Sequence, residues 1–538
     1  MGGGLLQLVA HGAQDAYLSG NPQITFWKGL FKRHTNFAME PFRVNLTGVP
    51  AWGNKQSVTL ARHADLLYST YLEVVLPTTQ IVNGVEKKVD WNNEQGRLGY
   101  NLLDYVELEI GGQAIDRLYS EYLYLWDTLT ADANKSYQLY QMVGGGGDSR
   151  RNDGGPMAVN TADDGVNTNT AKYVYGYRPP AASASVKATG RPSSSSVLTI
   201  PLPFSYTRNP GAALPLIALQ YHEVKINILW NKWQFVTANF NGLQPPPPTT
   251  AVIHVDYIYL DVDERRRMAQ ESHEYLIEQV QFNEDKGLAA GANRIDLTFN
   301  HPVKELIWVV QPDRFTNCKI ADKTNNSVAT YGPPRPALQP TPAQQTLTVR
   351  RTSPLGSGAR LTPFTYTYLD QSGGATGTSL DEFDQTFTQP IFDMRLQING
   401  QDRLDRRGGD YYNRVQNYQH HTGTMKPAGF DTTPYLRVTP ATSAGVAMPT
   451  TPAADHVAAI PQSHRAIYTY SFALKPEENQ PSGTCNFSRI DTATIVMNMS
   501  GNYVVDENSD NVWNLRVYAI NYNILRVMSG MAGMAYSN

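Results

Sequence analysis

Residues 105–113 read YVELEIGGQ, and residues 393–401 read DMRLQINGQ. Apolar side chains occupy every second position in both stretches, at Val106, Leu108 and Ile110 and again at Met394, Leu396 and Ile398. A period of two is typical of a strand with one buried face. The glycine and glutamine that end each stretch lie 288 positions apart (112 to 400, 113 to 401). The same strand-and-turn unit therefore occurs once in each half of the chain.

Further alternating segments follow these two stretches in a shared order. A strand near Ile200 or Ile467 is followed by one near Val224 or Ile495, and then by a long last strand at 253–260 or 515–524. Short matches can arise by chance, but the shared order favours a duplication. Many short strands with turn-rich connections indicate an all-β protein built of antiparallel sandwiches or barrels. The clearest helical segment is 263–281, which begins with Asp263, Glu264 and three arginines.

Composition excludes several classes of protein. The 538 residues are 41% hydrophobic and 17% charged, so a disordered chain is excluded. A formal net charge of −3 argues against direct nucleic-acid binding. Two cysteines, Cys318 and Cys485, are too few for a disulfide framework, although one bridge between them stays open. No apolar stretch reaches the roughly 18 residues of a transmembrane helix.

No catalytic, cofactor or metal site emerges from the motifs. The eleven histidines include no His-x-His pair, and the adjacent His420 and His421 lie in a loop-like segment where joint chelation is not expected. The glycines at 144–147 are not followed by the Lys and Ser/Thr of a phosphate-binding loop. We therefore expect no enzyme activity, no cofactor and no bound metal. Among the Asn-x-Ser/Thr sequences, Asn325 is the best placed for a glycan, because it lies in a long aperiodic segment.

Several long sequence blocks resemble the major capsid proteins of nucleocytoplasmic large DNA viruses. They include the opening residues 3–26 and 33–38, the segment DERR at 263–266 with SHEYLI at 272–277, QPSGTCNFSR at 480–489, and the ending 516–531. The resemblance spans nearly the whole chain. It implies an all-β fold of two tandem eight-stranded antiparallel jelly rolls, with long surface loops and few short helices.

This resemblance also implies a domain plan. The expected units are an N-terminal arm at 1–30, a first jelly roll at 31–262 with a long loop at about 127–196, a helical linker at 263–281, and a second jelly roll at 282–538 with long loops at about 312–389 and 401–464.

The implied function is structural. Homotrimers would form pseudo-hexagonal capsomers that tile an icosahedral shell, in contact with neighbouring capsomers, minor capsid and penton proteins, and an internal viral membrane beneath. The protein would reside in the virion after assembly in the host cytoplasm. The alternative function is that of a carbohydrate-binding or carbohydrate-active jelly-roll protein, which would show an aromatic groove and, if active, a pair of carboxylates.

The arm is more apolar than a free terminus should be, which suggests that it docks on other subunits or proteins during assembly. The residues expected to carry this contact are Leu5, Leu6, Leu8, Val9, Phe26 and Trp27.

Overall fold

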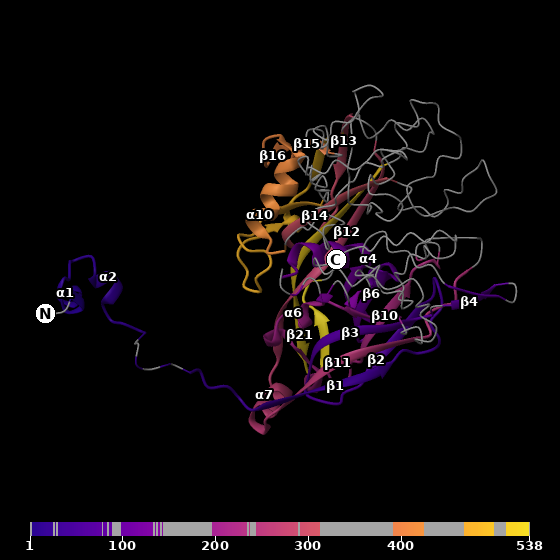
Figure 1. The fold of residues 1–538 in the computed structure, drawn as a ribbon, viewed down its shortest axis with the longest axis horizontal. Helices are drawn as coiled ribbons and strands as arrows, with labels where there is room; N and C mark the ends of the chain where they lie inside the picture. Colours follow the sequence, from indigo (N-terminus) through magenta and orange to yellow (C-terminus); the bar gives the residue numbers. More distant parts are fainter. Residues whose placement is uncertain are drawn as a thin grey trace, which may run out of the picture.

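Two β-barrels and a projecting N-terminal arm make up the part of the chain that the structure describes (Figure 1). The computed structural model describes residues 3–24, 31–77, 79–82, 85–88, 98–132, 196–233, 244–288, 291–312, 391–423, 467–499 and 513–536, with a few single positions between them.

The first barrel consists of a five-stranded and a four-stranded antiparallel sheet. One has the order β1 (Phe37–Asn45), β11 (Thr250–Leu260), β3 (Leu66–Leu76) and β8 (Ser196–Pro201), with β9 (Leu214–Pro215) also paired to β3. The other has the order β2 (Lys55–Leu60), β10 (Val224–Trp230), β6 (Leu103–Ile110) and β7 (Gln113–Tyr119). A separate hairpin joins β4 (Thr79–Val82) to β5 (Val85–Lys88).

The second barrel repeats this order. One sheet runs β12 (His273–Leu288), β21 (Trp513–Met528), β14 (Pro302–Pro312) and β18 (Ile467–Ser471), with β19 (Cys485–Asn486) and β22 (Met531–Met534) as short additions. The other runs β13 (Gly291–Asp296), β20 (Ala493–Met499), β15 (Ile391–Ile398) and β16 (Gln401–Asp402), with β17 (Arg407–Gly408) beside β15. In both barrels the first strand pairs with the last and the second with the next to last, so the fold is a double jelly roll.

The repeated sequence unit forms equivalent hairpins in the two barrels. Ile110 pairs with Gln113 across β6 and β7, and Ile398 pairs with Gln401 across β15 and β16. Both central residues of each turn have positive φ, namely Gly111 at 59°, Gly112 at 84°, Asn399 at 50° and Gly400 at 76°. Two-residue turns of this kind follow the natural twist of the strands, and glycine or asparagine adopts them at little cost.

Helices are short and few within the described ranges. They are α1 (Gly3–Val9), α2 (Ala16–Ser19), α3 (Leu98–Asn101), α4 (Ser120–Thr130), α6 (Ser205–Arg208), α7 (Val262–Gln270) and α10 (Gln416–His420), with 3₁₀ turns at Pro210–Ala212, Leu216–Ala218 and Phe487–Arg489 and a π turn at Tyr411–Val415.

Two expectations about local structure were wrong. The helix expected over 263–281 ends at Gln270, and His273 begins β12 instead. Its partner β21 pairs with it from His273 to Leu288, so long-range pairing prevails over local helical character. The loop expected from 401 begins with β16, β17 and α10, because short strands and a single helical turn leave no clear periodicity in a sequence. The remaining long segments, 144–195, 313–390 and 424–466, lie outside the described residues.

The sheet containing β21 separates two hydrophobic cores. Tyr518 and Ile520 belong to the core of the first barrel, whereas Val517 and Ala519 belong to the core of the second. On β14, Ile307 and Trp308 divide in the same manner. Successive side chains of a strand point to opposite faces, so this sheet acts as a wall shared by both barrels. Figure 1 shows β12 and β21 between β1, β2 and β11 on one side and β13, β15 and β16 on the other.

Candidate assembly surfaces and the junction between the barrels

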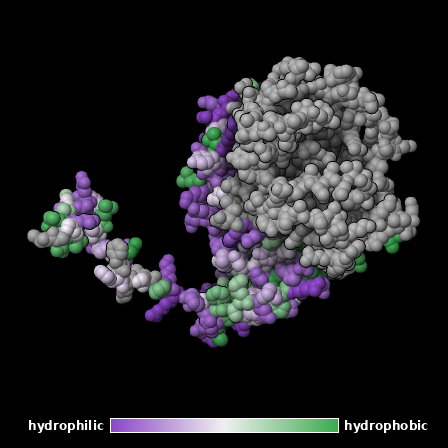
Figure 2. All heavy atoms as spheres, in the orientation of Figure 1, coloured by the Kyte–Doolittle hydropathy of each residue, from purple (hydrophilic) through white to green (hydrophobic). Residues whose placement is uncertain are grey.

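The N-terminal arm extends away from the body, and neither α1 nor α2 has a buried residue (Figure 1). The apolar side chains singled out in the sequence are exposed, with Leu5 at 57%, Leu6 at 62%, Leu8 at 70%, Val9 at 80% and Trp27 at 94%. Phe26 lies outside the described residues. Figure 2 shows hydrophobic residues along the arm with nothing packed over them. An exposed apolar series of this kind is typical of a surface that another protein covers.

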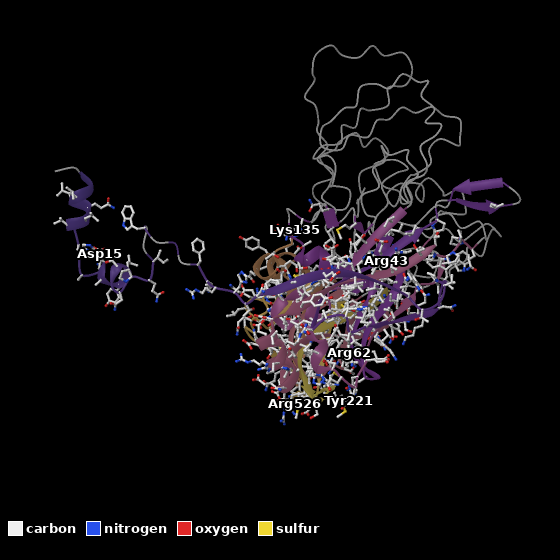
Figure 3. The ribbon with its side chains drawn as sticks, turned by 90° about the horizontal axis from the view of Figure 1, so that it is seen from below. Asp15, Arg43, Arg62, Lys135, Tyr221 and Arg526 are labelled. Atoms are coloured by element: carbon white, nitrogen blue, oxygen red, sulfur yellow. The ribbon has the colours of Figure 1, made fainter. Side chains whose placement is uncertain are left out.

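A second exposed apolar group lies where the hairpin of β21 and β22 meets the first barrel. It consists of Tyr221, Met528 and Met531, which are 75%, 52% and 50% exposed. The Tyr221 N–H donates to the Gly530 carbonyl at 2.9 Å, which fixes the hairpin against the first barrel. In Figure 3, Tyr221 lies with Arg62 and Arg526 at one end of the body, and Lys135 lies at the other.

Between the barrels, a network of buried charges joins α6 of the first barrel to β12 and β14 of the second. Arg208 and Lys304 both bind the carboxylate of Glu278, each at 2.5 Å. Arg208 also donates to the Tyr122 hydroxyl at 3.2 Å and lies over the ring of Trp126. Burial lowers the pKa of Lys304, while the charge of Glu278 opposes that shift. Both cations therefore contact the same carboxylate, which offsets part of the cost of burying them.

Asp116 of β7 completes this contact. Its carboxylate accepts the backbone N–H of Val280 at 3.0 Å and that of Arg117 at 2.9 Å. Burial raises the pKa of Asp116 to about 6, although these hydrogen bonds and the charge of Arg208 oppose the shift. A strand of the first barrel therefore holds a strand of the second through a buried carboxyl group.

Helix α4 forms a second charged contact across the junction. Glu121 on α4 accepts hydrogen bonds from Arg516 at 2.9 Å and from the Tyr518 hydroxyl at 2.7 Å, both on β21. Arg516 also pairs with Glu284 of β12 at 3.1 Å. Burial would lower the pKa of Arg516, but the charge of Glu121 raises it, so the guanidinium stays charged.

Sequence reasoning did not single out any of these junction residues. A usable signal was present at Lys304 and Glu305, two charged residues inside the otherwise apolar run of β14. Charged side chains are almost never fully buried unless they are paired. Lys304 is 1% exposed and Glu305 is 0% exposed. The sequence at Lys304 and Glu305 therefore predicts buried partners of opposite charge, but it does not identify them.

Asn325 and Cys318 lie outside the described residues, and Cys485 is a half-buried free thiol. Across the described ranges, no three His, Cys, Asp or Glu side chains gather in a way that could hold a metal ion. In that same part of the chain, no helix is long and apolar enough to cross a membrane.

Comparison with known proteins decides the family. A family profile described as the major capsid protein N-terminus matches residues 25–261, and one described as the large eukaryotic DNA virus major capsid protein matches residues 264–432 and 449–533. The chain belongs to the major capsid proteins of large eukaryotic DNA viruses. The two profiles divide the capsid protein where α7 separates its barrels.

Individual relatives agree with this assignment over their full length. The capsid protein is 38% identical to the major capsid protein of Phaeocystis pouchetii virus and 34% identical to that of Paramecium bursaria Chlorella virus 1, with 100% of each chain covered. Its fold is similar to a chain of the PBCV-1 virus capsid, with a TM-score of 0.58 and 28% identity over 96% of this chain and 100% of that one. The Faustovirus major capsid protein shares the fold alone, with a TM-score of 0.57 and 12% identity over 96% and 94% of the chains.

The capsid protein is thus a structural component of a virion. The alternative function as a carbohydrate-binding or carbohydrate-active protein gains no support from these relatives.

Proposed function

We propose that three copies of this capsid protein form a homotrimer with a pseudo-hexagonal outline, and that these capsomers tile an icosahedral shell. The support is the shared wall between the barrels. A rigid unit of two similar barrels presents two similar sides, so three copies supply six barrels around one axis. Closed symmetric assemblies are the usual outcome for identical subunits.

The first test is the mass and outline of the purified protein. Light scattering should give about three times the 59.7 kDa of one chain, and electron microscopy should show hexagonal particles. A monodisperse monomer without a hexagonal outline would contradict the proposal.

The arm is proposed to fasten the capsomer to its surroundings. Its partners would be neighbouring capsomers, minor capsid and penton proteins, or the layer next to an internal viral membrane. The apolar side chains from Leu5 to Val9 support this role, because their burial against a partner would contribute about 25 cal/mol for each Å² removed from water.

Deleting residues 1–25 should leave trimers intact and abolish shell assembly, because no side chain of α1 or α2 is buried in the body. Replacement of Leu5, Leu6 and Leu8 by serine should have the same effect, whereas serine at Gln7 and Gln14 should not. The measurements are light scattering for trimers and microscopy of assembled particles. Normal shells formed without the arm would rule this role out.

The remaining parts of the proposal are an absence of enzyme activity, assembly in the host cytoplasm, and no direct contact with nucleic acid. The near-neutral charge balance of 45 basic to 48 acidic residues supports the last of these.

A further inference from the structure

His421 lies fully buried between two carboxylates that come from different parts of the second barrel. Its Nε2 is 2.5 Å from Glu305 Oε1 on β14, and its Nδ1 is 2.9 Å from Glu477 Oε1 in the segment after β18. The side chains of His421 and Glu305 are 1% and 0% exposed. An imidazolium carries an N–H on each ring nitrogen and can therefore face two carboxylates at once, whereas a neutral imidazole has a single N–H.

The residues beside His421 connect this ion triad to the first barrel. Thr422 donates its N–H and its hydroxyl to Glu477, at 3.1 Å and 2.5 Å. The Gly423 N–H then donates to the carbonyl of Leu129 at 2.7 Å, near the C-terminal end of α4. A Cβ atom at position 423 would overlap that carbonyl oxygen, so only glycine allows so close an approach.

We propose that protonated His421 is a latch that holds residues 421–423 of the second barrel against α4 of the first, and that loss of its proton opens the latch. The charged form is required because a neutral imidazole has a single N–H. One carboxylate would then remain buried without a donor, which is unfavourable in a site this dry.

The surroundings of His421 set the direction of the pH dependence. Burial alone would lower the pKa of His421, but the charges of Glu305 and Glu477 raise it to about 9. Of the other charged groups close by, Lys304 turns toward Glu278, and Lys475 pairs with Glu478 at 2.6 Å. His420 contacts the Leu474 carbonyl, and α4 presents the Leu129 carbonyl. A raised histidine pKa means that the stabilisation is complete below the unfolded-state pKa and is lost as the pH rises through about 9.

Hydrogen exchange of the full-length protein tests the latch without any variant. Exchange of the amides of residues 417–423 should be measured from pH 6 to pH 10.5 and corrected for the intrinsic rate at each pH. Protection should stay constant below about pH 6.5, fall by up to tenfold per pH unit between about pH 6.5 and pH 9, and level off above pH 9, as expected for the release of one proton. Constant protection up to pH 10.5 would overturn the proposal.

Two variants separate the latch from general alkaline damage. His421→Gln should lower protection at 417–423 and remove its pH dependence, whereas His420→Gln, which changes the neighbouring histidine, should behave like the wild type. Should His421→Gln fail to fold, Glu477→Gln serves instead. Removal of one carboxylate should move the loss of protection to a lower pH, and an unchanged midpoint would contradict the latch.

Discussion

Asp116 is a carboxyl group whose burial works against the native state at neutral pH. Its oxygen accepts the backbone N–H of Val280 across the junction and that of its neighbour Arg117, yet its pKa rises from 3.8 to about 6, because the hydrogen bonds do not offset burial. The native state therefore holds this proton to a higher pH than the unfolded chain does. The stabilisation that this bound proton gives to the native state is complete below about pH 4 and is lost as the pH rises through 6.

Asp116→Asn should remove this pH dependence. Asparagine keeps the oxygen that accepts the two N–H groups and cannot ionise. Between pH 4 and pH 7 the wild type should lose about 3 kcal/mol of unfolding free energy that the variant retains. Denaturant unfolding at several pH values measures the difference, with the exposed Asp491→Asn as the control. Parallel pH profiles for Asp116→Asn and the wild type would show that the carboxyl group does not titrate in this way.

At the scale of elements, α4 is one of the elements that attach the two barrels to each other. It belongs to the first barrel by sequence, but Glu121 near its start binds β21, and Leu129 near its end accepts the Gly423 N–H. A short helix thus connects to the second barrel near both of its ends.

Gly423→Ala should loosen this attachment. The added methyl group overlaps the Leu129 carbonyl, so the segment must move, at a cost of about 1–3 kcal/mol. Gly408→Ala is the matched control, because its nearest non-neighbouring atom would lie 3.7 Å from the new Cβ. Denaturant unfolding compares the two variants, and equal stabilities would contradict the close contact.

The sequence predicted the strands that alternate and missed the contacts that join them. The hairpin at Ile110 to Gln113 was evident because apolar periodicity and turn glycines are local signals. His421 was considered only as a metal ligand, since its neighbour His420 was the nearest histidine in the sequence. Its true partners, Glu305 and Glu477, lie 116 and 56 positions away, and no periodicity connects them. The prediction of a helix that reaches Gln281 was wrong for the same reason. Residues 273–288 form β12 because they pair with the distant strand β21.

At the scale of the whole molecule, the shared wall makes the two barrels depend on each other. The core of the first barrel includes Ile277, Ile307 and Ile520, all from strands of the second. Removing either barrel would expose one face of this sheet to water. We therefore expect the chain to unfold as one unit, despite its two similar halves.

Ile520→Ala tests this dependence, because the side chain is fully buried in the first core while its strand belongs to the second barrel. It should lower the unfolding free energy by about 2–5 kcal/mol. Hydrogen exchange in β6 of the first barrel and in β20 of the second should rise together. Met497→Ala, which lies in the second core alone, should also loosen both barrels. Two separate calorimetric transitions would contradict a single unit.

The strand β21 also has a consequence for how such genes recombine. Successive residues of β21 face the two cores in turn, so the sequence of this strand must fit the side chains of both barrels. An exchange near the codons of α7, which look like a natural boundary, would combine a first barrel from one virus with a wall shaped for another. Viable hybrids should therefore carry compensating changes in β12, β14 and β21, or come from parents that already share those strands.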